Sequence, residues 1–292
     1  PPPVPRWPVD SAAAHVLDYA RQQVEAIVTL DPAVRRQQPD AVHRMRVASR
    51  RLRSLLRGAR AVLDRDATAH LEAELRHLAA ELGVDRDREV LTERLTRRLD
   101  ELPDDLRLGP VAERLAAWDR ERRTGARALL ERLLDSPRHL DLLDALDRLL
   151  TAPPLRPHAA ERPARRVLAK AMRRDRDRLA RRLRTAYATP AGPERDAALH
   201  SARKAAKRAR YAAEAAVPAV GKPARRQAER CRALQRALGD HQDSVVARAA
   251  LRDLAAQAQA AGEPSFSYGV LHEREAAVAA DRAREAAKLP VG

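Results

Sequence analysis

Cysteine and aromatic residues are almost missing from this chain. Its 292 residues include one cysteine, Cys231, which excludes an internal disulfide bond and a thiolate metal cluster. Two Trp, four Tyr and one Phe are too few for the stacking surface on which proteins bind single-stranded bases. Such sparse cysteine is typical of a reducing compartment, so we expect a cytoplasmic protein.

Long apolar stretches are missing as well. No run approaches the roughly 18 apolar residues of a membrane-spanning helix, so we expect no membrane partner. The opening segment, PPPVPRWPVD, has no apolar stretch of the kind found in signal peptides. It also lacks an initiator Met, from which we expect a trimmed chain.

Positive charge, by contrast, is abundant. The chain has 57 Lys and Arg against 41 Asp and Glu, a formal net charge of +16. A surplus of this size predicts an acidic partner, which can be a nucleic acid, an anionic membrane or another polyanion.

Strong helix formers make up most of the sequence. Ala, Leu, Arg and Glu dominate, and most of the 20 Pro lie between periodic segments, where they end helices. The sequence therefore predicts an all-α fold in which short connections place successive helices antiparallel in bundles. The expected helices are 10–30, 40–63, 67–82, 85–101, 110–135, 137–151, 162–188, 194–216, 222–238, 241–261 and 267–288.

The chain contains an internal repeat. The segment VHRMRVASRRLR (42–53) aligns with LHSARKAAKRAR (199–210). At almost the same offset, LGVDRD (82–87) aligns with LGDHQD (238–243), and a third, shorter match follows. Three matches in the same order indicate two homologous halves.

This repeat defines the expected domain organisation. Residues 1–10 form an N-terminal tail, and residues 11–288 form a single domain whose copies span about 11–152 and 155–288. A long period that occurs only twice argues against a solenoid. We expect two helical bundles of the four-helix type, built of long helices and related by an internal pseudo-two-fold axis.

One helix of each copy carries a stripe of basic residues opposite its apolar face. At 100° per residue, the stripe of the first copy consists of His43, Arg46, Arg50, Arg53 and Arg57. The stripe of the second copy consists of His200, Arg203, Lys207 and Arg210, flanked by Lys204 and Arg208. No acidic residue lies between Ala41 and Leu63, whereas Glu214 ends the second stripe one turn earlier.

A solvated surface is the ordinary explanation of a charge run. Solvated helix faces usually mix signs, however, because pairs at i and i+4 stabilise the helix. These stripes are nearly one-signed, which costs self-repulsion, and the cost occurs in both copies. The pattern therefore predicts an anion that neutralises the stripes.

The repeated segments closely resemble the CHAD family, the conserved histidine α-helical domain. The resemblance rests on residues 42–53 and 199–211, and the Leu-Gly segments at 82–87 and 238–243 resemble the family's second motif. It implies two four-helix bundles with internal two-fold symmetry around a basic central cavity or pore that binds inorganic polyphosphate. It also implies association with polyphosphate granules.

The resemblance implies a set of ligand-facing residues by position. These are His43, Arg46, Arg50, Arg53, His200, Arg203, Lys204, Lys207 and Arg210. We add basic residues that flank the stripes or lie on the helices 10–30 and 162–188, namely Arg51, Arg57, Arg208, Arg21, Lys170, Arg173 and Arg174. The departures from the motif at Ser201, Ala202 and Glu214 imply a weaker second half.

Polyphosphate suits these residues chemically. It is a flexible line of anionic oxygens without bases, so it needs charge and hydrogen-bond donors but no aromatic side chains. The planar guanidinium of arginine offers several donors to phosphate oxygens and stays charged.

Other functions fit the sequence less well. A nucleic-acid-binding protein that uses the same basic faces is the second hypothesis, although the chain has no helix-turn-helix signature. An enzyme of phosphate metabolism would need carboxylates within the stripes. Neither His43 nor His200 has a second ligand at i+4, so no metal site is expected. We predict a binding protein that is not an enzyme and has no cofactor; its oligomeric state is left open.

Overall fold

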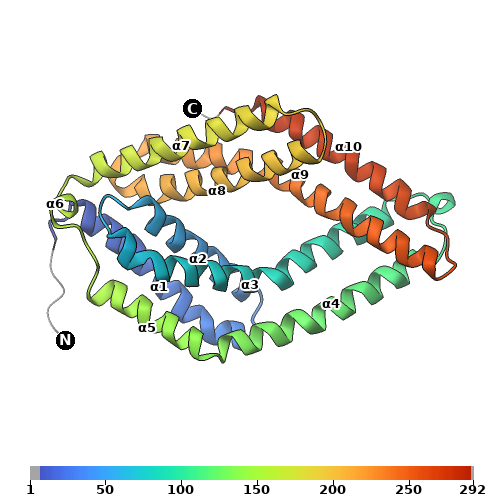
Figure 1. Ribbon diagram of the computed structural model, residues 1–292, viewed down its shortest axis with the longest axis horizontal. Helices are drawn as coiled ribbons and strands as arrows, with labels where there is room; N and C mark the ends of the chain where they lie inside the picture. The colour runs from blue at the N-terminus through green and yellow to red at the C-terminus, as the bar shows by residue number, and fades with distance from the viewer. Residues whose placement is uncertain (1–6, 291–292) are drawn as a thin grey trace.

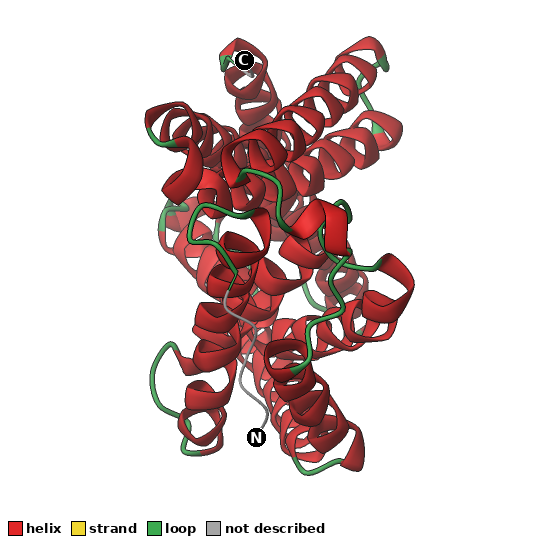
Figure 2. Cartoon of the chain, turned by 90° about the vertical axis from the view of Figure 1, so that its left-hand side faces the viewer, coloured by secondary structure: helices red, strands yellow, loops and turns green. Residues whose placement is uncertain are grey.

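Helices account for nearly all of the structure, a computed structural model that describes residues 7–290 (Figure 1, Figure 2). Their bounds are α1 Ala12–Arg35, α2 Ala41–Gly58, α3 Arg65–Asp100, η1 Asp104–Leu106, α4 Val111–Leu134, α5 Pro137–Thr151, α6 Pro157–Ala160, α7 Ala164–Ala188, α8 Pro193–Val220, α9 Lys222–Ala260 and α10 Phe266–Lys288. The predicted all-α fold is confirmed. Within residues 7–290, no helix is long and apolar enough to cross a membrane.

The order of packing repeats along the chain. Helix α2 packs between α1 and α3, and α4 packs on α3; in the same way α8 packs between α7 and α9, and α10 packs on α9. The two sets meet through α1 with α7, α2 with α8 and α3 with α9. Helices α5 and α6 connect the sets.

A reciprocal pair of hydrogen bonds joins the starts of the two sets. The backbone N–H of Ala12 donates to the carbonyl of Arg162, and that of Ala164 donates to the carbonyl of Asp10, each at 2.8 Å. Ala12 begins α1 and Ala164 begins α7. Such mutual bonds between equivalent positions are compatible with the pseudo-two-fold arrangement that the sequence predicts.

The predicted helix breaks after residues 82 and 238 are wrong. Helix α3 runs unbroken through Gly83, and α9 runs unbroken through Gly239. A glycine inside a helix costs only about 1 kcal/mol relative to alanine, and neither position is followed by a proline. Tertiary packing on both sides of each glycine outweighs that cost.

The two long helices each pass from one apolar core to another. Buried apolar side chains of the described residues form three clusters. Helix α3 contributes Leu82 to one cluster and Leu95 to the next, while α9 contributes Leu238 and Leu251 to two different clusters. The Leu-Gly motifs therefore lie where each helix leaves a core, and the polar segments between cores face the basic stripes.

Candidate anion-binding site

Helix α2 packs against α8, and basic residues of the two stripes act on one another there. Arg46 and Arg50 come from α2, and Arg203 and Lys207 come from α8. Burial lowers the pKa of Arg50, and the charges of Arg46 and Arg203 lower it further. We call Arg46, Arg50, Arg203 and Lys207 the central cluster.

Lys207 shows how crowded the positive charge is. Burial and the neighbouring Arg50, Arg203 and Arg46 lower the pKa of Lys207 from its ordinary 10.5 to about 6, against the opposing pull of Asp87. Removing the ammonium from water and placing it among like charges both disfavour its charged form. At neutral pH, Lys207 is therefore mostly uncharged when no anion is bound.

Carboxylates compensate only part of the positive charge of the central cluster. Arg46 donates to both carboxylate oxygens of Asp87, at 2.9 and 3.1 Å. In the described part of the chain, no carboxylate oxygen lies within 4.0 Å of the charged nitrogens of Arg50, Arg203 or Lys207. The Nε atom of Arg203 is also buried without a hydrogen-bond partner. Three basic residues of the cluster therefore lack an ion-pair partner.

The glycines of the second motif let these arginines approach the long helices. A Cβ atom added to Gly83 would lie 2.9 Å from Nη2 of Arg46, so the guanidinium rests directly on the backbone of α3. The equivalent approach is looser in the second copy, where Nε of Arg203 would lie 3.8 Å from a Cβ on Gly239. Glycine thus serves a close approach here rather than a helix end.

The outer part of the first stripe is neutralised by another helix. Nε of Arg57 lies 3.1 Å from Glu72 of α3, and Arg53 and Arg60 each lie 4.0 Å from the same carboxylate. Burial and the Arg57 charge lower the pKa of Arg53, while Glu72 opposes them. The sequence analysis missed Glu72 because this residue belongs to α3 and not to the stripe.

The second stripe is neutralised from within and from α7. Nε of Arg210 lies 3.1 Å from Glu214, and Arg51 of α2 donates to the same carboxylate at 3.2 Å. Nε of Arg208 lies 2.9 Å from Asp175, a fully buried residue of α7. Glu214 was visible in the sequence as the residue that ends the stripe, whereas Asp175 had no signal there.

The two motif histidines lie at the margins of the central cluster. His43 is exposed and lines a hollow of about 470 Å³ near the start of α2. His200 is half-buried and lines a separate hollow of about 390 Å³ with Asp196 and Arg248. Burial lowers the pKa of His200, and the charge of Lys204, which is exposed, lowers it further. The structure thus joins His200, but not His43, electrostatically to the cluster.

The remaining expected site residues lie elsewhere. Arg21 of α1 and both Lys170 and Arg173 of α7 are exposed, and none of them takes part in the central cluster. Arg174 donates to the carbonyl of Gly58 at 3.1 Å and so satisfies the end of α2.

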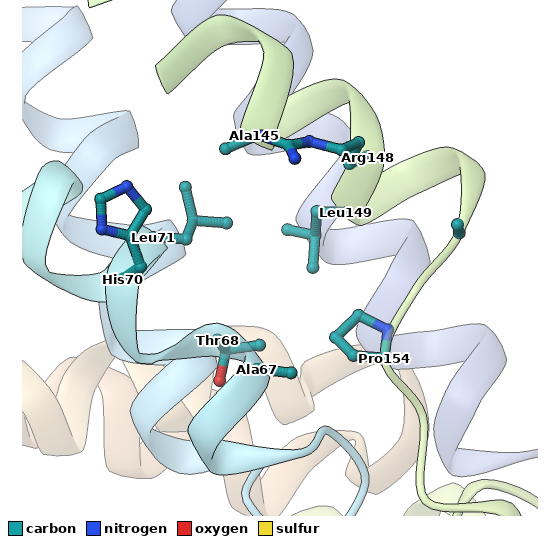
Figure 3. Close-up of a pocket in the computed structure, with 9 residues that line it drawn as sticks. Ala67, Thr68, His70, Leu71, Ala145, Arg148, Leu149 and Pro154 are labelled. Carbon is teal, nitrogen blue, oxygen red and sulfur yellow. The ribbon is translucent and has the colours of Figure 1, made fainter. Parts of the chain in front are cut away.

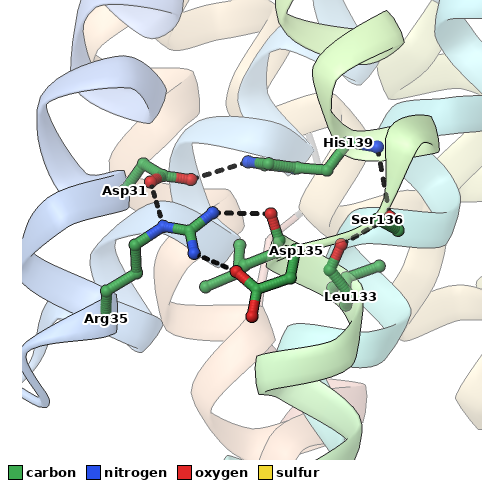
Figure 4. A network of polar contacts seen from close by, with 7 residues as sticks. Asp31, Arg35, Leu133, Asp135, Ser136 and His139 are labelled. Carbon is green, nitrogen blue, oxygen red and sulfur yellow. Dashed lines mark hydrogen bonds and ion pairs between the residues drawn. The ribbon is translucent and has the colours of Figure 1, made fainter.

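Several charged residues elsewhere in the protein are matched with opposite charges. In the network of Figure 4, Arg35 contacts Asp31 at 2.7 Å and also Asp135, while Nε2 of His139 lies 2.6 Å from Asp31. Buried polar groups normally have such partners. The central cluster departs from this rule.

A further pocket lies between α3 and α5, away from the stripes. It encloses about 280 Å³, and its lining is mainly apolar, with Leu71, Leu149 and Pro154 beside His70 and Arg148 (Figure 3). One arginine at its edge does not make a site for a polyanion.

Comparisons with known proteins agree with the fold and the motifs. The family model of the CHAD domain matches residues 18–252. An uncharacterized protein of Mycobacterium tuberculosis, in strains CDC 1551 / Oshkosh and H37Rv, is 43% identical over 267 residues, which cover 90% of this chain and 50% of the relative. The chain therefore spans about half the length of the curated relatives it matches.

Two solved structures resemble the whole chain. PptA from Streptomyces chartreusis superposes with a TM-score of 0.80 at 24% identity, over 94% of this chain and 97% of that chain. The crystal structure of the CHAD domain from the plant Ricinus communis superposes with a TM-score of 0.70 at 26% identity, over 96% and 93%. At 24% identity, the similarity to PptA supports the fold alone.

Proposed function

We propose that this chain, which belongs to the CHAD domain family, binds inorganic polyphosphate at the central cluster. The family is linked to polyphosphate binding in general. The observation that carries the proposal for this chain is the crowding of Arg50, Arg203 and Lys207 without a carboxylate partner. Like charges held together destabilise the free protein, and a polyanion offsets that cost.

Polyphosphate fits the cluster better than duplex nucleic acid does. The four side chains are partly buried where α2 packs on α8, so a narrow flexible chain reaches them more readily than a rigid duplex. Arginine guanidinium groups bind phosphate oxygens directly, and this binding needs no nucleobase. Nucleic acid stays the second candidate because its phosphates carry the same charge.

We also propose that the chain holds polyphosphate without hydrolysing it, and that this binding associates it with polyphosphate granules. The engagement of Asp87 with Arg46 supports a binding role, because it ties this carboxylate to a cation. Binding alone is sufficient for association with a polyanion-rich granule.

A competition experiment tests the proposal. Labelled long-chain polyphosphate is bound to the protein at about 150 mM salt and displaced by unlabelled polyphosphate or by duplex DNA of matched charge. We expect polyphosphate to displace the label at lower concentration and expect no phosphate release at stoichiometric protein. Equal or better displacement by DNA, or release of phosphate, would contradict the proposal.

A further inference from the structure

Helix α7 carries half of the protein's net charge. Its 25 residues include ten Lys or Arg and two Asp, a net of eight positive charges against +16 for the whole chain. Of the two acids, Asp175 is buried and faces Arg208, and Asp177 lies 3.2 Å from the adjacent Arg176. The exposed face of α7 is therefore almost purely basic.

The basic residues form a line along the outer side of the helix. The buried positions of α7 share one face, and at 100° per residue the opposite face carries Arg166, Lys170, Arg173, Arg181 and Arg184, with Asp177, which is paired with Arg176, as the one acid among them. All five side chains are exposed, and in the described part of the chain no carboxylate oxygen lies within 4.0 Å of their charged nitrogens. From Arg166 to Arg184 the line is about 27 Å long. In Figure 1, α7 runs along the upper edge of the molecule.

This outer line is separate from the central cluster. Helix α8 packs against both α7 and α2, and carboxylates reduce the positive charge between the two surfaces. Arg208 is engaged with Asp175, and Arg57 is engaged with Glu72. Arg178 of α7 also faces Arg208 and Arg57 there, so the stoichiometry of binding decides whether the two surfaces hold separate chains.

The residues of the outer line favour a flexible polyanion over a lipid surface or a nucleic-acid duplex. None of the exposed large hydrophobic side chains of the described residues lies on α7, so the helix lacks the apolar face with which amphipathic helices enter a lipid surface. The phosphates of a duplex spiral away from a straight line of charges, whereas a flexible polyanion can follow it. The outer face therefore suits a single extended chain of phosphates.

We propose that the outer line of α7 binds a second polyphosphate chain, so that one molecule bridges two chains. The inference rests on the proposed function of the central cluster and extends it. Two sites on one rigid domain raise the effective concentration of the second contact. Bridging of this kind would cross-link long polyphosphate into a network.

Stoichiometry with a short ligand tests the second site. Titration calorimetry with polyphosphate of about ten units, long enough for one site, should give two chains per wild-type protein. The variant Lys170→Gln, Arg173→Gln, Arg181→Gln should bind one chain and melt like wild type, since all three side chains are exposed. A central variant, Arg203→Glu, should retain the chain bound at α7.

A charge-matched control separates the line from net charge. The variant Arg36→Gln, Arg97→Gln, Arg132→Gln removes three exposed charges from scattered places and should still bind two chains. With long polyphosphate, wild type and this control should raise light scattering by cross-linking, and the α7 variant should bind without doing so.

The outcomes distinguish this inference from the proposed function. One chain per wild-type protein, two chains on the α7 variant, or equal losses in the control would overturn the second site while leaving the central site in place. Tighter binding of duplex DNA than of polyphosphate to α7 would overturn it as well. When Arg203→Glu is added to the α7 variant, loss of the one polyphosphate chain that this variant still binds supports both sites. If wild-type protein binds no polyphosphate, both sites are refuted.

Discussion

Raising the pH from about 7 to about 9 should weaken polyphosphate binding, because the anion favours the charged form of Lys207. Burial and the facing Arg50, Arg203 and Arg46 lower the pKa of this lysine to about 6, and the carboxylates of Asp87 and Asp243 oppose them. The free protein therefore carries little charge at Lys207 over this range. A phosphate chain against the ammonium raises its pKa again, so binding takes up a proton.

The size of the effect follows from linkage. Each pH unit above the free pKa and below the bound pKa lowers the affinity tenfold, or by about 1.4 kcal/mol. If binding restores the ordinary pKa of lysine, the affinity falls about 100-fold between pH 7 and pH 9. The other nearby groups add little, because arginine keeps its charge throughout and the lowered pKa of His200 leaves that residue neutral in the free protein.

Titration calorimetry in two buffers of different ionisation enthalpy measures both the affinity and the proton uptake. Long polyphosphate keeps the titration of chain ends negligible. The variant Lys207→Arg retains a charge at every pH tested, so its affinity should stay level between pH 7 and pH 9. Lys207→Gln should bind weakly and also without pH dependence, and Arg97→Gln, an exposed change on α3, should follow wild type. A level wild-type profile, or an unchanged slope in Lys207→Arg, would refute the reasoning.

Three more outcomes follow from the site. Arg203→Glu should weaken polyphosphate binding by about 1.5–3 kcal/mol for each charged hydrogen bond lost, and should lower the melting temperature because it places a second carboxylate near Asp243. Arg46→Glu should weaken binding similarly and lower the unfolding free energy by about 1 kcal/mol, because it places two carboxylates together at Asp87. For wild type, the logarithm of the binding constant should fall against the logarithm of salt concentration with a slope between about −4 and −7, and a slope near zero would place binding off the basic faces. Gly239→Ala should stabilise α9 by about 0.5–1 kcal/mol in thermal melts, whereas Gly83→Ala should gain less, because its Cβ displaces the guanidinium of Arg46.

The helices were predictable because their signal is local. Apolar periodicity and proline positions identify α5 and α7 to within a few residues, whereas α1 continues past its expected end to Arg35, with Pro32 inside the helix. The continuity of α3 and α9 was not predictable from glycine alone. Whether a glycine ends a helix or admits a neighbour depends on what packs against it, and the neighbour of Gly83 is Arg46, 37 positions earlier in the chain.

The basic residues of the site could be predicted from helical angles, but the carboxylates that balance their charge could not. The angles place Arg46, Arg50, Arg203 and Lys207 on corresponding faces of two repeated helices, and the fold brings those faces together. Their neutralising partners come from other helices and leave no trace in the stripe itself. The choice of a control position for charge reversal depends in the same way on contacts from other parts of the structure.

Arg122 illustrates this dependence. The mixed charges around Arg122 in the sequence predict a neutral control position for charge reversal. Its guanidinium lies over the ring of Trp118, 4.0 Å from the ring centre, and reversal would remove this cation–π contact. Arg97, which is exposed and makes no such contact, replaces it as the control.

The positions of the carboxylates explain why anion binding concentrates at the middle of the stripes. Glu72 compensates part of the charge at the far end of the first stripe and Glu214 part of that of the second, whereas Arg50, Arg203 and Lys207, where α2 packs on α8, have no ion-pair partner within residues 7–290. Among the described residues, Asp87 is the only one whose carboxylate lies within 4.0 Å of a charged nitrogen of the central cluster. Its side chain is 70% exposed. An exposed ion pair contributes little stability, so a phosphate can take the place of Asp87 on Arg46 at small cost. Asp87 therefore acts as an anion that the ligand displaces. Arg203 and Lys207 have the more distant carboxylate of Asp243, and Arg50 and Lys207 that of Asp87, to offset their charge.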